Sequence, residues 1–262
     1  MRVSRLYLAV TLQVGQTFAL DDDSAHYLRT VLRLKEQTEL ILFNGEDGEY
    51  LASLTEVSRK HVRVSIKEWI NRSVESSLNV VMGLGISRGD RMDLAVQKSV
   101  ELGVNTITPL MTARCNVPLK ADKENSSADL PGFKNLEGLK KSKESSKLLH
   151  WQKIAQHASE QSGRTLVPPL NPIEELENWV TQQQGLKIFL DPYAQFNLKQ
   201  LQPEQNLVTL LSGPEGGFTE TEREIAKAAG FIPVSLGKRI LRTETAALAA
   251  LSAVQMLWGD FA

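Results

Sequence analysis

The chain has 262 residues, 42% of them hydrophobic, which is enough for one large domain or two modest ones. Its 30 basic and 31 acidic residues leave a net charge of −1, which excludes a generally polycationic nucleic-acid binder but allows a local basic patch. The single cysteine excludes an internal disulfide, and the four histidines lack metal-ligand spacing, so we expect no metal site. No apolar run approaches the roughly 18 residues that span a bilayer, so we expect a soluble cytoplasmic protein without a membrane partner.

Residues 1–72 are predicted to form a small β-barrel. Short runs rich in Val, Ile, Leu and aromatic residues predict strands at LYLAV, ELILFN, YLASLTEV and HVRVSIKEWI. Asn44-Gly45 and Asp47-Gly48 lie between two of these runs and predict a hairpin. One helix, with Ser24 as its N-cap, interrupts the strands. The polar stretch 70–77 predicts a linker, and the first domain is expected to end there.

Residues 73–262 switch to alternating strands and helices. Near-continuous apolar strands separated by helices favour an α/β domain, with a parallel sheet covered on both faces. The expected strands are NVVMGLGI, TITPL, GLKIFL, LVTLL and FIPVSL. The expected helices include Asp90–Leu102, a long one around Leu148–Gln161, TETEREIAKAA, and a last one from Thr243 to about Trp258.

Residues 120–147 do not fit this alternation. The segment is rich in Lys, Ser and Glu and poor in large apolar residues. A structureless loop of this length within a compact domain is usually functional or disordered. We expect a flexible insertion, which is either disordered or becomes ordered on a partner.

The turn Ser212-Gly213-Pro214-Glu215-Gly216-Gly217 is the first candidate binding element. It follows an apolar strand and precedes a helix that Thr219 and Glu222 cap reciprocally. Glycines allow a ligand to approach the main chain closely, and the helix start offers free N–H groups. The dinucleotide and phosphate-loop fingerprints are absent. A carboxylate in the turn suits a cationic ligand such as a sulfonium, and an ordinary tight turn is the alternative.

The loop after FIPVSL is the second candidate. Lys238, Arg239 and Arg242 follow a strand whose carboxyl end is where open α/β sheets bind ligands. Such a cluster can contact RNA phosphates or polarise a substrate carbonyl, and a solvated loop is the alternative. The final helix, AALAALSAVQMLW, is expected to serve core or subunit packing.

Taken together, SGPEGGFTETE and LGKRILRTETAALAAL closely resemble the RsmE-type 16S rRNA uridine-N3 methyltransferases of the SPOUT superfamily. HYLRTVLR, RMDLAVQKSVELGVNTITPL and WQKIAQHASEQSGR followed by VPPL resemble the same family, so the likeness covers most of the chain outside the insertion. The sequence departs from the family pattern at Arg114-Cys115-Asn116-Val117. The resemblance implies a PUA-like β-barrel, a SPOUT domain with a trefoil knot, and a homodimer. It also implies S-adenosylmethionine as methyl donor and the small-subunit uridine conventionally numbered 1498 as target.

The resemblance also implies residue roles. The expected donor-binding residues are Leu190, Leu211, Ser212, Gly213, Gly216, Gly217, Leu236, Ile240, Leu241, Arg242, Thr243 and Ala246. The chemistry of methylating N3 leads to the further hypothesis that Arg242 stabilises a uracil oxygen and that Glu215 or Glu244 accepts the N3 proton. Glu160 and Arg164 are further candidates for the pocket or the partner subunit. The expected RNA-phosphate contacts of the first domain are Arg2, Arg5, Arg29, Arg33 and Lys35.

The sequence alone allows two other functions. One is a non-catalytic RNA-binding or ribosome-assembly factor that keeps the fold, although the intact glycine turn and the LRTETA loop argue against it. The other is a nucleotide-dependent small-molecule enzyme that binds ATP or NAD, and it is supported by the glycine turn alone.

Overall fold

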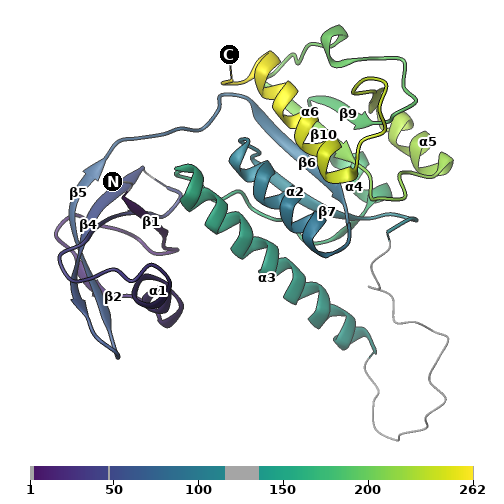
Figure 1. The fold of residues 1–262 in the computed structure, drawn as a ribbon. Helices are drawn as coiled ribbons and strands as arrows, with labels where there is room; N and C mark the ends of the chain where they lie inside the picture. Colours follow the sequence, from purple (N-terminus) through teal and green to yellow (C-terminus); the bar gives the residue numbers. More distant parts are fainter. Residues whose placement is uncertain (1–2, 47, 116–135, 262) are drawn as a thin grey trace, which may run out of the picture. The chain divides into compact units, whose positions relative to one another are not determined.

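The computed structural model describes residues 3–46, 48–115 and 136–261, with side chains in the last range from Glu144 onward (Figure 1). The described chain forms two compact units. The first contains residues up to Glu75 together with Gln156–Val167, and the second contains Ser76–Ala155 and Pro168–Ala262. Arg2 and residues 120–135 of the expected insertion lie outside the described residues, as do Asn116 and Val117.

The first unit is built on a five-stranded sheet in the order β1-β3-β4-β5-β2. Its strands are β1 (Ser4–Tyr7), β2 (Thr17–Ala19), β3 (Glu39–Phe43), β4 (Glu49–Val57) and β5 (Val62–Ile70). The β3–β4 and β4–β5 pairs are antiparallel, and β1 is parallel to β3. Alternate residues of β5, namely Val62, Val64 and Ile66, are buried in one apolar cluster, as a half-buried strand requires.

The helical segment of the first unit begins earlier than the sequence predicted. Asp21, not Ser24, is the N-cap of α1 (Asp22–His26), because its carboxylate accepts the Ser24 N–H at 2.9 Å. Burial alone would raise the pKa of Asp21, but the hydrogen bonds from Ser24 lower it below its usual value. A π-helical turn, η1 (Tyr27–Val31), continues the helix.

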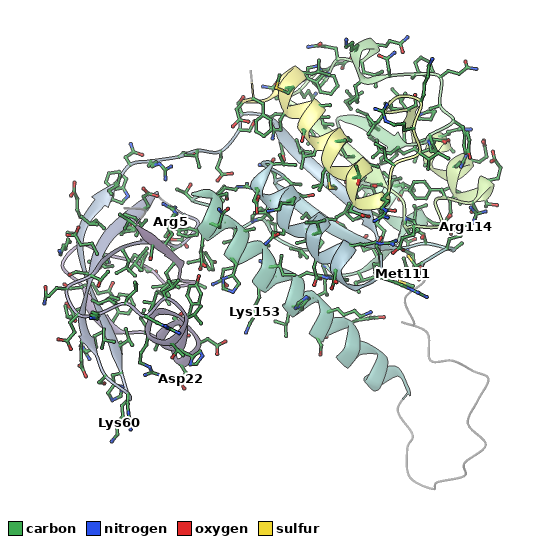
Figure 2. All side chains as sticks on the ribbon, viewed as in Figure 1. Arg5, Asp22, Lys60, Met111, Arg114 and Lys153 are labelled. Atoms are coloured by element: carbon green, nitrogen blue, oxygen red, sulfur yellow. The ribbon has the colours of Figure 1, made fainter. Side chains whose placement is uncertain are left out.

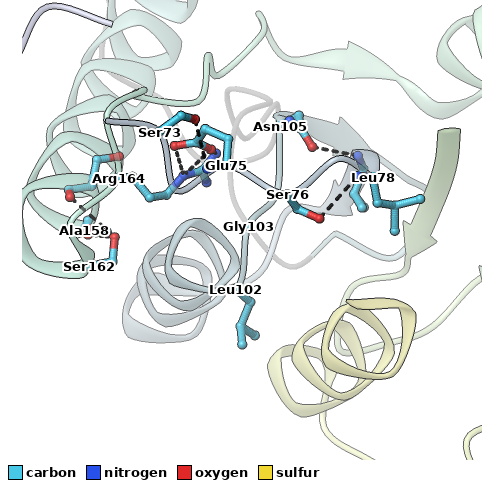
Figure 3. Close-up of polar contacts among 12 residues, drawn as sticks. Ser73, Glu75, Ser76, Leu78, Leu102, Gly103, Asn105, Ala158, Ser162 and Arg164 are labelled. Atoms are coloured by element: carbon cyan, nitrogen blue, oxygen red, sulfur yellow. Dashed lines mark hydrogen bonds and ion pairs between the residues drawn. The ribbon is translucent and has the colours of Figure 1, made fainter. Parts of the chain in front are cut away.

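Two polar contacts hold the end of α3 (Leu136–Ser162) within the first unit. The Glu160 carboxylate is buried and accepts the Tyr7 N–H of β1 at 3.0 Å. Just beyond the helix, the buried Arg164 guanidinium turns toward Glu75 and donates from Nε to Oε2 at 3.0 Å (Figure 3). Glu160 and Arg164, which we had considered for the pocket, are therefore structural residues of the first unit.

The second unit contains a six-stranded sheet in the order β11-β9-β10-β6-β7-β8, and every pair in it is parallel, as predicted. Its strands are β6 (Asn79–Gly85), β7 (Thr106–Met111), β8 (Glu174–Glu175), β9 (Leu186–Leu190), β10 (Leu207–Ser212) and β11 (Ile232–Val234). Because the strands are parallel, the loops that follow β9, β10 and β11 leave from the same edge.

Helices cover both faces of this sheet (Figure 1). They are α2 (Gly89–Glu101), α4 (Leu176–Gln182), α5 (Glu220–Ala228) and α6 (Thr243–Trp258), with a short 3-10 turn, η2 (Leu198–Gln200). Leu110, Phe189 and Leu211 of the sheet share an apolar cluster with α4 and α5, whereas α2 packs against α6, which also contacts β9 and β10.

The long helix α3 differs from its prediction. It begins at Leu136 rather than near Leu148, so residues 136–147 of the expected insertion are helical. No helix in the described parts of the chain combines the length and the apolar character that crossing a membrane requires.

Candidate functional site

The second unit has a cavity of about 480 Å³ at the carboxyl edge of its sheet, formed by the loops after β9, β10 and β11 and the start of α6. Open α/β sheets bind ligands at this edge, and the volume is that of a small-molecule site. Its walls combine apolar side chains, the glycine turn and several arginines. Pro214 of the glycine turn and Arg239 of the basic loop, both in predicted binding elements, also line the cavity. The lining residues that the sequence did not predict are Arg91, Arg114, Asp191, Pro192, Tyr193, Phe218, Arg223 and Val234.

The donor-binding residues expected from the sequence come together around this cavity, with one exception. Residues from all three loops line it, namely Leu190, Ser212, Gly213, Gly216, Gly217, Leu236, Ile240, Leu241, Arg242, Thr243 and Ala246. Leu211 does not, because strand alternation turns its side chain into the buried cluster with Trp179 and Phe189.

The glycines of the turn have two roles. They allow other protein atoms to pack closely against the turn, and they leave room for a ligand. A Cβ on Gly216 would lie 2.8 Å from the Cβ of Arg114, and one on Gly213 would lie 3.2 Å from the Phe218 ring. Gly217 has open space but a φ of +65°, which favours glycine. Gly85, at the end of β6, fits more tightly than the glycines of the turn, since a Cβ there would lie 2.5 Å from the Pro214 nitrogen.

The Glu222 carboxylate holds the turn against the segment that follows β7. Glu222 is buried in the first turn of α5, where it completes the predicted capping box by accepting the Thr219 N–H at 2.7 Å. Its other oxygen accepts the Ala113 N–H at 2.7 Å. The sequence predicted the cap but not the second bond, because Ala113 is distant in the chain.

Arg114 makes the second link between these segments. It lies beyond the end of β7 (Figure 2), and its guanidinium donates to the Gly216 carbonyl at 2.9 Å. The departure from the family pattern at Arg114-Cys115 therefore begins in the wall of the cavity.

The cavity carries more positive than negative charge. Five arginines line it, at 91, 114, 223, 239 and 242, against the two acidic residues Asp191 and Glu215. Arg223 pairs with Asp191 at 3.2 Å, and Arg91 pairs with Glu215 at 3.3 Å. Among the described residues, the guanidinium groups of Arg239 and Arg242 have neither a hydrogen-bond partner nor an ion-pair partner, so their charges are available to a ligand.

The two candidate proton acceptors have different environments. Glu215 lines the cavity, and its Oε1 accepts the Arg88 N–H at 3.1 Å while its buried Oε2 has no partner. Glu244, in the first turn of α6, is buried and also has an unpartnered Oε2, but it does not line the cavity. The geometry therefore favours Glu215 of the two.

The predicted phosphate contacts of the first unit separate into two groups. Arg5 is buried, donates to Glu49 and to the Arg164 carbonyl, and so is a structural residue. Arg33 and Lys35 are exposed, and Arg29 is half-buried.

Arg29 connects this region to the β4–β5 hairpin, which the sequence analysis had not singled out. Its Nη1 donates to the carbonyls of Ser58 and Arg59 at 2.9 and 2.8 Å. Arg59 and Lys60 are exposed between β4 and β5, and Figure 2 shows Lys60 at the hairpin tip. Arg33 has a φ of +54°, which is uncommon for a residue other than glycine.

In the part of the chain that the structure describes, no group of three or more His, Cys, Asp or Glu residues is placed to hold a metal ion. Cys115 is a free, half-buried thiol near the Thr112 hydroxyl.

Comparison with known proteins identifies the family to which this fold belongs. A family model described as an RNA methyltransferase domain matches residues 74–130 and 134–255, which is most of the chain. The chain belongs to the RNA methyltransferase family. A second model, described as an RNA methyltransferase PUA domain, matches residues 20–67 of the first unit.

Members of this family match the chain along its full length. The ribosomal RNA small subunit methyltransferase E of Buchnera aphidicola is 35% identical over 99% of this chain and 98% of its own. That of Bacillus subtilis is 28% identical over 98% of this chain and 100% of its own.

Solved structures of the family agree with the fold. The methyltransferase E of Neisseria gonorrhoeae, bound to S-adenosylmethionine, has a TM-score of 0.86 and 36% identity over the whole of both chains. A protein from Legionella pneumophila in complex with the same cofactor has a TM-score of 0.88 and 37% identity over the whole of both chains. The SPOUT-type α/β unit and the PUA-like unit predicted from the sequence are thus confirmed.

Replacing Glu222 tests the link between the turn and the β7 segment. Glu222→Ala removes a charged acceptor from the N–H groups of Thr219 and Ala113. Because hydrogen bonds to charged groups contribute about 1.5–3 kcal/mol, we expect the free energy of unfolding to fall by about 3 kcal/mol in denaturant titrations.

Glu224→Ala is the matched control on the same helix. Glu224 is exposed and pairs only with Lys227, so its loss is expected to change the free energy of unfolding by less than about 0.5 kcal/mol. Equal effects of the two substitutions would show that the Glu222 bonds have no special role.

Proposed function

We propose that this chain transfers the methyl group of S-adenosylmethionine to N3 of one uridine in 16S rRNA, the position conventionally numbered 1498. The observation that carries the proposal is the cavity, where the three loops of the family motif converge. It holds one carboxylate oxygen and two guanidinium groups that have no partner in the described part of the chain. Membership of the methyltransferase family and the relatives named for small-subunit RNA support the reaction class and the substrate class.

The residues present fit the donor. Leu190, Leu236 and Leu241 offer an apolar wall for its adenine, and the glycine turn offers main-chain groups at close range. The free Oε2 of Glu215 provides a negative group for a cationic ligand. Bound there, S-adenosylmethionine supplies an electrophilic methyl group. Two full-length relatives in solved structures bind the same molecule, which supports this assignment.

Arg242 is proposed to stabilise charge on the uracil. The N3 atom of neutral uracil carries a proton and is a poor nucleophile, so negative charge must develop on the ring oxygens as that proton leaves. The exposed Arg242 lines the cavity at the start of α6, with no partner among the described residues. A guanidinium fixed at this position can hold a uracil oxygen by a charged hydrogen bond.

Glu215 is proposed to accept the N3 proton. Its Oε1 is held by the Arg88 N–H and by Arg91, which fixes the carboxylate in the cavity wall. Its Oε2 is bonded to no group in the described chain, which leaves that oxygen as the proposed acceptor. Glu244 stays a second candidate, although it does not line the cavity.

The first experiment is transfer of labelled methyl from S-adenosylmethionine to small ribosomal subunits that lack the modification, followed by identification of the product nucleoside. We expect 3-methyluridine at one site. Arg242→Ala and Glu215→Gln are each expected to lower kcat by about a hundredfold or more, because each removes a group that acts in the transition state.

Lys238→Ala and Glu244→Gln are the matched controls, since neither residue lines the cavity, and both are expected to keep kcat within about threefold. A loss confined to Glu244→Gln would transfer the role of proton acceptor to Glu244. Donor binding without any methyl transfer would favour a non-catalytic assembly factor.

We further propose that the first unit contacts the phosphates of the RNA through Arg29, Arg33, Lys35 and the hairpin cations Arg59 and Lys60. The family match to a PUA domain of RNA methyltransferases supports an RNA-binding role for this unit. Arg29 holds the hairpin tip through two carbonyls, which brings the cations of both segments to one region. The unusual backbone at Arg33 and the π-helical turn before it are features that recur at functional sites.

Charge reversal tests this surface. Arg33→Glu and Lys60→Glu are each expected to weaken binding to small subunits several-fold and to reduce the salt dependence of log K by about one, while donor affinity is unchanged. Lys67→Glu is the matched control, because Lys67 is also exposed in this unit but pairs with Glu39. An equal loss in all three variants would indicate general electrostatic attraction instead of a defined surface.

We also propose that the chain acts as a homodimer. Met256 and Leu257 of α6 and the following Phe261 are large apolar side chains that remain exposed, as a subunit contact requires.

A further inference from the structure

Tyr193 lines the cavity but remains largely exposed. It follows β9, lines the cavity, and keeps 73% of its surface exposed. Ile240, in the loop after β11, lines the same cavity and is 77% exposed. These are the two most exposed of the large apolar side chains in the described chain, and both lie at this cavity.

The Tyr193 ring is held in position by a charged pair. The buried Asp191 carboxylate accepts the Tyr193 backbone N–H at 3.0 Å through one oxygen. Through its other oxygen it pairs with Arg223 of α5 at 3.2 Å. The Arg223 guanidinium in turn lies 5.8 Å from the centre of the Tyr193 ring, within the range of a cation–π contact.

This arrangement leaves one face of the ring available. Arg223 covers one face, and the exposure of the side chain indicates that the other is open. The backbone hydrogen bond and the guanidinium contact restrain this tyrosine before any ligand arrives. A flat ring can therefore stack on it at little further entropic cost.

We propose that Tyr193 is a stacking platform for an RNA base that enters the cavity, and that Asp191 and Arg223 are the residues that position it. The inference rests on the proposed methyl transfer to RNA and names a substrate contact for it. Enzymes that modify a base take it out of its stack and bind it against aromatic or apolar side chains. Base–aromatic stacking does not depend on the identity of the base. The stacked base can therefore be the target itself or a base beside it.

The exposure of Tyr193 favours an RNA base over the adenine of the donor. Small-molecule sites cover most of their ligand, and the residues that do so are themselves largely enclosed. A side chain that is three-quarters exposed lies at the mouth of the cavity, where a macromolecular substrate arrives. Adenine and an RNA base are both flat heteroaromatic rings, so the test must separate them.

The test measures two affinities for the full-length chain, and neither depends on turnover. One is the Kd for small ribosomal subunits that lack the modification, and the other is the Kd for S-adenosylmethionine. Tyr193→Ala is expected to weaken subunit binding by at least about fivefold while donor affinity stays within about twofold, because one base–aromatic stack is lost. Tyr193→Phe keeps the ring and is expected to bind like the wild type.

Phe196→Ala is the matched control, since Phe196 is an exposed aromatic residue of the same unit that does not line the cavity. Loss of donor affinity in Tyr193→Ala would overturn the proposal and assign the ring to adenine. Unchanged subunit binding would overturn it as well. Methyl transfer by the wild type is scored separately, so failure of the proposed function is distinguishable from failure of this contact.

The positioning role is tested by a double-mutant cycle. Arg223→Ala is expected to weaken subunit binding, and Arg223→Lys to restore part of it through the retained cation. In the Tyr193→Ala background, Arg223→Ala should have little further effect, because the two residues act through one ring. Fully additive losses would show that Arg223 contacts the RNA independently of Tyr193.

Discussion

The bonds accepted by the Glu222 carboxylate are the interaction on which the cavity depends. One oxygen caps α5 directly after the glycine turn, and the other holds the segment that follows β7. A buried carboxylate is unfavourable unless it accepts hydrogen bonds. Separating the two segments would break the bonds that Glu222 accepts from them, and replacing those bonds with water would cost free energy. The turn is thereby fixed in place before a ligand binds.

With the turn fixed, the remaining features of the site follow from the parallel sheet. Parallel strands direct the loops after β9, β10 and β11 to one edge, and Gly85 lets the turn pack directly on the end of β6. Three of the five cavity arginines are engaged with the protein, and within the described residues the guanidinium groups of Arg239 and Arg242 have no partner. In the proposed function, a cationic donor binds near Glu215 and the uracil ring near Arg242.

The sequence was most informative where local chemistry decides the structure. Apolar strand runs predicted the parallel sheet, the Thr219–Glu222 spacing predicted the cap of α5, and the glycine turn and basic loop predicted where the site lies. Leu211, predicted to bind the donor, does not line the cavity, because strand alternation turns its side chain into the buried cluster.

What the sequence could not supply were contacts between distant segments. Arg114 on Gly216, Arg91 on Glu215 and Arg223 over Tyr193 each join residues that are far apart in the chain, and no periodicity encodes such pairs. Arg5 is a further example. From the sequence, an arginine in an N-terminal strand is expected to be a surface charge, and only the structure shows its ion pair with Glu49.

The most direct test of the account is the affinity for S-adenosylmethionine of two alanine variants on β6, measured by calorimetry. Gly85→Ala places a Cβ against the backbone of Gly213 and Pro214, whereas Gly83→Ala places one against the Trp179 and Leu110 side chains, which belong to the α4 side of the sheet. Both are expected to cost stability through overpacking. The account predicts at least about tenfold weaker donor binding for folded Gly85→Ala and wild-type affinity for folded Gly83→Ala. Unchanged affinity in Gly85→Ala would contradict the claim that the glycine turn forms the donor site.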